Sequence, residues 1–523
     1  MKKSSFIEGA LIATLAIFFT KFLGIIYVIP FYSIVGSQGG ALYGYAYNIY
    51  NLFLIISSAG IPLAISKLTS EYNALSKNKE KEYLFISTKK IIFIFSLVSF
   101  LICFIFAPQL ASLIIGNIEG GNTPQDIAFV IRCVSFAILI VPMLSISRGY
   151  LQGHGYIKPS SNSQIIEQVI RIIIIIFGSF LSLKVFKLSL KTSIGVAVFG
   201  ASFGAIAAYF YLLNKMKKVK QNYNNNDKLE KNTKKEIIKK IIYYAIPFIV
   251  INIANSLYNS VDMILLIRGL NYLNFDAIDI ETISSVFTTW GHKLNSIVTS
   301  IATGVAISLV PSISENRAKK ELDAINDKFN KLFLVFLYIA LPLAIFMSIF
   351  SKEIWTVFYG QSYYGPIIFK LLILTAAVDA LYIMICNGLQ GLNKTKLIYI
   401  SVITGLIINL CLDIPLMILF EKIGIYPFYG AIIATIIGYT ISLIIPLISL
   451  KMEFNIKYKN TLKKIPKLLV VYLIMIFLSS IYHGIINDVQ SRIILIPLIA
   501  IIAIILLILY YILNKKEIEE ILG

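Results

Sequence analysis

Long apolar runs, separated by short polar stretches rich in charge, glycine, proline or asparagine, set the pattern of the whole chain. A bilayer core about 30 Å thick needs about 20 apolar residues for each crossing helix. The first run is too long for a cleaved signal, and no small-residue cleavage site follows it. We therefore predict an all-α polytopic membrane protein with about 14 transmembrane helices, at residues 6–34, 42–67, 90–115, 127–148, 163–183, 192–214, 241–267, 282–311, 330–350, 364–389, 397–420, 427–450, 466–486 and 492–513.

The composition narrows the class of protein further. Of the 523 residues, 58% are hydrophobic and only 14% are charged, whereas a soluble domain is about 25% charged. So much apolar surface exceeds what one or two soluble cores can bury. A soluble enzyme, a disordered chain and a secreted disulfide scaffold are thereby excluded.

The basic residues outnumber the acidic ones by 47 to 27. If the predicted spans alternate from a cytoplasmic N-terminus, 35 of the 47 lie on the cytoplasmic side, 7 lie outside and 5 fall in spans or at their edges. Only Lys184, Lys187 and Lys191 fit poorly. This bias follows the positive-inside rule, so we predict that both termini are cytoplasmic. The lysine-rich loops then need no nucleic acid to explain them, and we expect them to meet anionic membrane lipids.

Two sequence echoes indicate an internal duplication. GIPLAISKLTSE at 60–71 resembles GVAISLVPSISE at 304–315, and GYLQG at 149–153 resembles GLQG at 388–391. Chance similarity between apolar segments is the alternative, but both echoes have nearly the same spacing. Parallel repeats of this kind are typical of transporters, with the substrate path between the repeats. We therefore predict an N-lobe of six helices at 1–214, a cytoplasmic linker at 215–240, a C-lobe of six helices at 241–450, and a C-terminal helix pair with its tail at 451–523.

Two lysines fall deep inside predicted spans. Lys21 lies in the middle of the first span and Lys293 in the eighth, in early helices of opposite lobes. A charge at mid-bilayer costs at least a few kcal/mol, so it usually faces a cavity or a partner. We predict that both lysines line one central cavity. Such cations suit an anionic head group such as a phosphate, which lysine binds as a point charge.

Carboxylates also occur within the spans. Glu167 and Arg171 are four residues apart, hence on one helical face, and are expected to form a structural ion pair. Asp262, Asp379 and Asp413 are candidates for a coupling-ion or proton site. For Asp413, which precedes a proline, capping of a broken helix is the alternative.

Several kinds of catalytic chemistry lack their sequence signatures. The four cysteines show no CxxC spacing, the three histidines stand in no metal-ligand pattern, and no Walker A motif occurs. No Ser/His/Asp constellation stands out. We therefore expect a transporter with no catalytic residue, no metal site and no cofactor.

One segment carries a specific family signature. Residues 148–171, RGYLQGHGYIKPSSNSQIIEQVIR, resemble a motif of the SpoVB-type polysaccharide-biosynthesis membrane proteins. The segments 20–31, 39–53 and 60–73 resemble the first two helices of the same family. The signature positions present here are Arg148, Gly149, Gln152, Gly153, Pro159, Ser163, Gln164, Glu167, Gln168 and Arg171.

The resemblance implies both a fold and an activity. The family belongs to the exporter superfamily that includes MATE drug transporters and lipid-linked oligosaccharide flippases (MOP), so a V-shaped pair of six-helix lobes with alternating access is expected. The first-helix block is similar to the YtgP branch, which acts as a lipid II flippase in Gram-positive bacteria. The implied function is to move an undecaprenyl-diphosphate-linked saccharide, lipid II above all, across the bacterial plasma membrane for peptidoglycan synthesis.

The resemblance also suggests roles for particular residues. Lys21, Lys293 and Arg148 would hold the diphosphate, and membrane potential, H⁺ or Na⁺ would drive the cycle. Cell-wall synthases are the implied protein partners. Tyr27 and Val28 stand where MurJ-type relatives often have an arginine, which makes the cavity less cationic. A structural or gating role is expected for Gly149, Gln152, Gly153, Glu167, Gln168 and Arg171.

Other functions remain open at this point. A MATE-type cation/drug antiporter is the first alternative, but one large MATE branch has a carboxylate in the first span, where this chain has Lys21. A flippase for another lipid-linked polysaccharide is the second. A membrane glycan polymerase or ligase is disfavoured because such enzymes usually place catalytic groups in a large outer loop, and the outer loops here are short.

Overall fold

The computed structural model describes residues 6–58, 60–116, 121–217 and 231–458, together with a few positions between 464 and 515. All regular structure within these four ranges is helical. The predicted spans at 466–486 and 492–513 lie almost entirely outside the described residues. Among the described residues, eight helices are long and apolar enough to cross a membrane, and the bent pair Phe19–Ile26 and Val28–Ser57 would make a ninth. The chain is therefore an all-α polytopic protein, as predicted.

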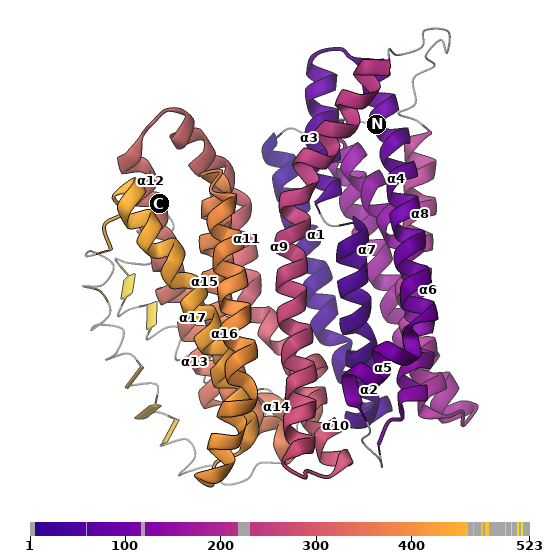
Figure 1. Ribbon diagram of the computed structural model, residues 1–523, viewed down its shortest axis with the longest axis vertical. Coiled ribbons are helices and arrows are strands. Elements are labelled where there is room, and N and C mark those ends of the chain that lie inside the picture. The colour runs from indigo at the N-terminus through magenta and orange to yellow at the C-terminus, as the bar shows by residue number, and fades with distance from the viewer. Residues whose placement is uncertain are drawn as a thin grey trace. The chain divides into compact units, whose positions relative to one another are not determined.

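The chain forms two compact units. The first comprises Met1–Ile264 with Asp276–Glu281, and the second comprises Leu265–Phe275 with Thr282–Gly523. The helices of the first unit before the linker are α1 Phe6–Ile26, α2 Val28–Ser58, α3 Ile61–Ala74, α4 Asn78–Ile105, α5 Ala107–Ile115, α6 Pro124–Gly153, α7 Ile157–Ile173 and α8 Leu190–Met216, with two π-helical turns, η1 Ile174–Gly178 and η2 Leu181–Val185, between α7 and α8. Within this unit α6 packs against α2, α3, α4 and α8, and α7 packs against α1 and α8 (Figure 1).

Two helices are shared between the units, and the remaining ones belong to the second unit. The shared helices are α9 Lys231–Tyr272 and α10 Ala277–Ser285. In the second unit α16 packs along α17, and α15 packs against α11, α13 and α17. The elements of that unit are η3 Val286–Trp290, α11 Gly291–Ala318, α12 Leu322–Val335, η4 Phe336–Ala340, α13 Leu341–Ile349, α14 Ser351–Tyr359, α15 Tyr364–Gly391, α16 Thr395–Lys422 and α17 Pro427–Phe454.

The first helices end at different places from those predicted. The chain bends by 45° between α1 and α2, and α2 then continues through the expected break, kinked at Gly36, which has φ 66°. The predicted span at 42–67 is instead divided before α3, where Gly60 adopts the left-handed conformation with φ 73°. Glycine reaches such angles without the steric cost that a Cβ would add. Hydropathy averages over these breaks, so apolar length alone could not locate them.

The start of α9 packs on the first unit. Ile237 and Ile241, both nearly fully buried, form a cluster with Leu68, Tyr72 and Leu84 of α3 and α4. A second cluster joins Ala245 of α9 to residues of α3, α4 and α6. The boundary between the two compact units falls within α9. The linker at 215–240 and the assignment of six helices to each lobe stay predictions.

The start of α6 is fixed by a reciprocal cap. The Thr123 hydroxyl accepts a hydrogen bond from the Asp126 amide at 3.2 Å, and the Asp126 carboxylate accepts one from the Thr123 amide at 3.1 Å. Pro124 occupies the first turn, where no amide donor is needed. Lys191, at the start of α8, pairs with Asp126 at 2.9 Å. The cap thus also links α6 to α8 at the end that we predict to face outward.

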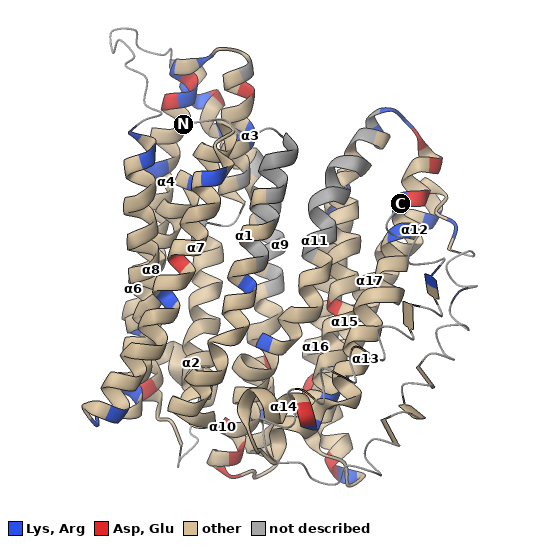
Figure 2. Ribbon diagram, turned by 180° about the vertical axis from the view of Figure 1, so that it is seen from behind, with Lys and Arg blue, Asp and Glu red and all other residues tan. Residues whose placement is uncertain are grey.

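Charged side chains in the first unit gather at the helix ends. Figure 2 shows Lys and Arg concentrated around the ends of α3, α4 and α8, while the middle of these helices is mostly uncharged. A low-dielectric bilayer interior disfavours charge, so this distribution is typical of membrane-spanning helices. The few charges within the helices are therefore the candidates for a functional site.

Candidate functional site

The two deep lysines occupy different units. Lys21 lies on α1 and Lys293 on α11, and both side chains are half-buried. Half-burial inside an apolar helix is compatible with contact to a polar cavity. Because one lysine belongs to the first unit and the other to the second, their joint lining of a cavity stays a prediction.

The three intramembrane aspartates are also divided. Asp262 lies half-buried on α9 within the first unit, whereas Asp379 on α15 and Asp413 on α16 belong to the second. Asp413 is fully buried. Across the described residues, no group of three or more His, Cys, Asp or Glu side chains is arranged to hold a metal ion. The role of the aspartates in ion or proton coupling stays a prediction.

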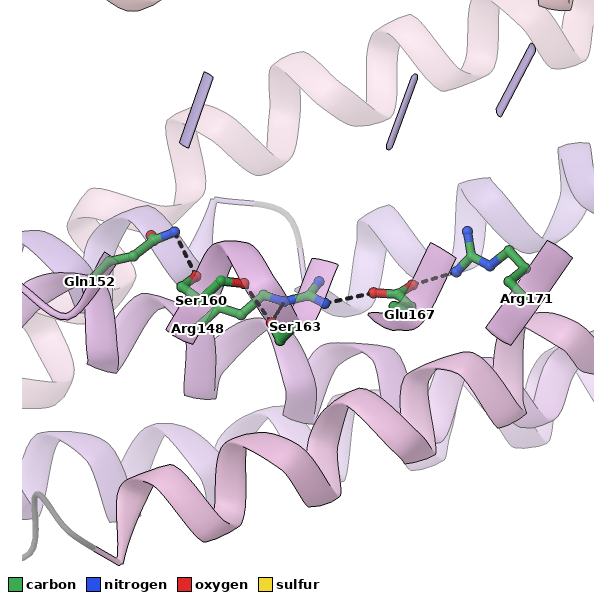
Figure 3. A network of polar contacts seen from close by, with 6 residues as sticks. All are labelled: Arg148, Gln152, Ser160, Ser163, Glu167 and Arg171. Atoms are coloured by element: carbon green, nitrogen blue, oxygen red, sulfur yellow. Dashed lines mark hydrogen bonds and ion pairs between the residues drawn. The ribbon is translucent and has the colours of Figure 1, made fainter. Parts of the chain in front are cut away.

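The family signature forms a buried ionic cluster (Figure 3). Glu167 on α7 accepts a hydrogen bond from Arg148 of α6 at 2.8 Å through Oε2, and one from Arg171 of α7 through Oε1. The side chains of Arg148, Glu167 and Arg171 are only 13%, 10% and 23% exposed. One carboxylate thus pairs with two guanidiniums, so the cluster keeps one net positive charge. We call Arg148, Glu167 and Arg171 the ionic triad.

Serine and glutamine side chains continue the network. Arg148 Nε donates to the Ser163 hydroxyl at 2.7 Å, and Ser163 in turn donates to the Ser160 carbonyl at 2.6 Å. Gln152 Nε2 donates to the Ser160 hydroxyl at 3.0 Å. These bonds tie the last turns of α6 to the first turns of α7. Since buried polar groups are costly when unpaired, the network favours one register between the two helices.

The signature glycines allow α6 to approach α3 closely. A Cβ on Gly149 would lie 2.4 Å from the Pro62 carbonyl oxygen, and one on Gly153 would lie 2.6 Å from that of Ser66. Both obstacles are backbone atoms, which cannot move aside as a side chain can. Glycines four residues apart therefore give a backbone-to-backbone contact, a packing mode common between membrane helices.

A second glycine pair brings α8 against the ionic triad. A Cβ on Gly204 would lie 2.5 Å from the Glu167 carbonyl oxygen, and one on Gly200 would lie 2.8 Å from that of Arg171. On the other side of α7, Gln168 Nε2 lies 3.5 Å from the Cβ position of Gly24 in α1. The backbone of α7 around the triad is therefore enclosed between α8 and α1.

Aromatic side chains fill the region where relatives were expected to carry an arginine. Tyr27 and Val28 are both buried, and the Tyr27 ring centroid lies 6.3 Å from that of Phe31. The series continues along α2, since Phe31 lies 5.2 Å from Tyr43, which stacks on Tyr47 at 4.3 Å. The bend after α1 is thus packed by aromatic rings.

The expected ion pair between Glu167 and Arg171 forms. The signature glycines and Gln152 make helix-to-helix contacts, and their structural or gating role stays a prediction. Arg148 was predicted as a substrate contact, and that role stays a prediction; here its guanidinium joins the triad. Ser163 was missed as a partner, although its position four residues before Glu167 on the same helical face was a usable signal.

Comparisons with known proteins agree with this architecture. The model of the family described as "Polysaccharide biosynthesis protein" matches residues 6–271, just over half of the chain, and the model of the MatE family matches residues 247–414. "Lipid II flippase MurJ" of Bacillus subtilis (strain 168) is 29% identical over 99% of this chain and 97% of its own length. "Stage V sporulation protein B" of the same organism is 23% identical over 69% of this chain and 68% of its own.

Two solved structures share the fold. A structure titled "Lipid II flippase MurJ, inward closed conformation" aligns with TM-score 0.66 and 20% identity over 97% of this chain and all of its own. An inward-facing multidrug resistance MATE family transporter of the MOP superfamily aligns with TM-score 0.66 and 14% identity over 83% of this chain and 94% of its own. The apolar helices and this fold define a multi-pass membrane protein of the MOP transporter architecture. Within that class, the chain belongs to the polysaccharide biosynthesis protein family.

Proposed function

We propose that this protein is a flippase that moves lipid II from the inner to the outer leaflet of the plasma membrane for peptidoglycan synthesis. The observation that carries the proposal is the similarity to a lipid II flippase over 99% of this chain and 97% of the relative. The match therefore extends over nearly the whole length of both sequences. The activity is transport, and no catalytic residue is assigned.

The head group sets the physical task. A diphosphate and its sugars cannot cross hydrocarbon unaided, because the free energy of moving charged groups from water into hydrocarbon is strongly unfavourable. In the proposed cycle a polar cavity takes the head group while the lipid tail remains in the bilayer. Lys21 and Lys293, with Arg148 near the cytoplasmic mouth, hold the diphosphate. Half-burial of both lysines supports this assignment.

The direction of transport needs an energy source. Each elementary charge moved across the membrane is worth about 2.3 kcal/mol per 100 mV, so the membrane potential can bias the cycle. Asp262, Asp379 and Asp413 are the proposed sites for coupling to H⁺ or Na⁺. The excess of basic residues in alternate loops supports cytoplasmic placement of both termini. Cell-wall synthases are the proposed partners that use the flipped lipid.

Two alternatives have specific support. The MatE match and the MATE structures favour a cation/drug antiporter, but the first helix places the cation Lys21 at mid-depth and its only acid, Glu8, at the edge. The family description favours a flippase for another lipid-linked polysaccharide. Both alternatives share the fold, so only the transported molecule separates them.

The test is replacement of known lipid II flippases. We expect this chain to restore growth and outward exposure of lipid II in a bacterium depleted of its own flippases. The double substitution Lys21→Met and Lys293→Met should lower lipid II exposure at least tenfold, since the loss of about 1.4 kcal/mol of binding is tenfold. Lys396→Met, at an exposed lysine near the start of α16, is the matched control and should leave exposure unchanged.

The outcomes separate the hypotheses. Failure of the wild-type chain to restore lipid II exposure, with expression confirmed, would falsify the proposed substrate. Normal exposure with the double variant would show that the two lysines do not hold the diphosphate. Ion-driven drug efflux without lipid II exposure would favour the antiporter.

A further inference from the structure

One short turn belongs to a different unit from the chain on either side of it. Residues Asp276–Glu281 group with the first unit, whereas Leu265–Phe275 before them and the chain from Thr282 onward group with the second. The turn includes the start of α10 and lies in a connection that the predicted topology places on the outer side. The contacts that hold this turn therefore belong to the first unit.

A buried carboxylate makes that attachment. Glu281 is only 6% exposed and accepts a hydrogen bond from the backbone amide of Asn122, just before α6. The amide side chains of Gln38 and Asn122 also interact with the Glu281 carboxylate. Asn122 Nδ2 donates in addition to the Gln38 carbonyl at 3.0 Å. Glu281 thus reaches the segment before α6 and the part of α2 next to its kink.

A glycine leaves room for the Glu281 carboxyl group, and we call the space that this group occupies the seat. A Cβ on Gly121 would lie 2.6 Å from both Cδ and Oε1 of Glu281, so the carboxyl group occupies space that any other residue at position 121 would fill. The second carboxylate oxygen, Oε2, is buried without a hydrogen-bond partner. A buried ionised carboxylate with an unsatisfied oxygen is unfavourable, whereas a protonated one is much less so.

The electrostatic surroundings of Glu281 also favour the protonated form of its carboxyl group. Burial raises the pKa of Glu281 above its ordinary value of 4.5, and the negative charge of Asp126 at the start of α6 raises it further. The polar groups of Asn122 and Gln38 lower the pKa of Glu281 but do not cancel this shift. Asp126 is itself paired with Lys191 of α8, and α2 contributes only the uncharged Gln38. The seat therefore favours the neutral form of the acid.

We propose that Glu281 is a positioning residue of the transport cycle: a proton-sensitive anchor that seats the 276–281 turn in the first unit and must leave when the outer side opens. The role of this release in transport rests on the proposed flippase function. The anchor holds most firmly when Glu281 is neutral. Release exposes the carboxyl group to water, where it ionises, and the next seating takes a proton back from the outer side.

The sign of the pH dependence follows from linkage. Seating raises the pKa, so the seated form binds a proton more tightly than the released form. Seating is weakest at a pH above the pKa of both the seated and the released form. It is strongest below 4.5, the ordinary pKa of the released carboxyl group. Between them the ratio of seated to released protein rises by up to tenfold for each unit that the pH falls. Acidification of the outer side should therefore close the anchor.

Distance measurements on the full chain test the anchor without any substrate. Spin labels are placed at the exposed positions Gln125 and Ile278, both in the first unit, in a background in which the four native cysteines are alanine, and the protein is held in lipid nanodiscs. We expect the short-distance population to grow as pH falls. Glu281→Gln should raise this population at neutral pH and remove its pH dependence. Gly121→Ala should lower it at every pH by displacing the carboxyl group.

A control variant in the same turn and two contrary results decide whether Glu281 is the anchor. Asp276→Asn removes an exposed charge from the same turn and should keep the wild-type response. The anchor is wrong if Glu281→Gln titrates like the wild type, or if Asp276→Asn abolishes the response. Because Glu281→Gln keeps the shape of the side chain, we expect this variant to fold, so its pH response tests the anchor directly. If the distances respond as expected but the wild type moves no lipid II in proteoliposomes, the anchor stands and the proposed substrate fails.

Discussion

Removing the central carboxylate of the ionic triad should destabilise the protein more than removing the whole triad. Glu167→Leu leaves Arg148 and Arg171 charged and largely buried, with side chains 13% and 23% exposed. Breaking a buried ion pair costs about 3–5 kcal/mol. The residual exposure of both arginines places the expected loss near the lower end, at about 3 kcal/mol. That loss is a more than hundredfold change in the ratio of folded to unfolded protein, at about 1.4 kcal/mol per tenfold.

The matched variant replaces all three charges with apolar groups. In Arg148→Met, Glu167→Leu, Arg171→Met no charge is left uncompensated, and such replacements are often neutral or stabilising. Ser163 keeps its bond to the Ser160 carbonyl at 2.6 Å, so its hydroxyl is not orphaned. We therefore expect the triple variant to unfold within about 1 kcal/mol of the wild type, against about 3 kcal/mol for the single variant.

Thermal unfolding in detergent, followed by fluorescence-detected size exclusion, gives the order of the three proteins. A triple variant as unstable as Glu167→Leu would refute the reasoning, because the loss could not then come from unpaired charge. The same variant tests the predicted substrate contact. If it is stable and exposes lipid II at the wild-type rate, Arg148 does not hold the diphosphate.

Three further predictions concern helix packing. Gly204→Ala should lower the yield of folded protein because its Cβ would meet the α7 backbone at 2.5 Å, while Gly24→Ala, whose nearest neighbour lies at 3.5 Å, should be tolerated; size-exclusion profiles compare the two. Ile241→Ala should cost about 2–5 kcal/mol and loosen the start of α9, so limited proteolysis there should accelerate; an unchanged rate would argue against its docking. Glu71→Gln should change the unfolding free energy by less than about 1 kcal/mol, since its pair with Lys240 is exposed and 3.7 Å long; a larger change in the unfolding midpoint would contradict this.

The sequence predicted the helices well because a membrane imposes one length on them. The spans expected at 364–389 and 427–450 correspond to α15 and α17, which begin at the predicted residues, Tyr364 and Pro427. The breaks at Gly36 and Gly60 were not predicted. They depend on single left-handed glycines, which a hydropathy average cannot resolve. The docking of α9 on α3 and α4 was missed because it depends on tertiary contacts between distant segments.

The candidate site, like the fold, was predictable from the sequence only in part. Helical periodicity alone placed Glu167 and Arg171 together, since residues four apart share a face. It could not bring Arg148 from α6 to the same carboxylate, because that contact depends on how two helices pack. Glu281 appeared in the sequence only as one of several acids in a short outer loop. Its carboxyl group is buried against Gly121 and Asn122, which are far from it in the chain.

The glycine contacts of α6 with α3 and of α8 with α7 determine how this part of the molecule can deform. Where two backbones touch, neither sliding nor rotation can be absorbed by a side chain changing rotamer, so each helix pair behaves as one stiff lever. Compliance must then be concentrated in the few places where the helical hydrogen bonding is already interrupted: the kink at Gly36, the break at Gly60 and the π-helical turns that follow α7. Deformation near the ionic triad is therefore expected at these interruptions, above all at the π-helical turns that directly follow α7.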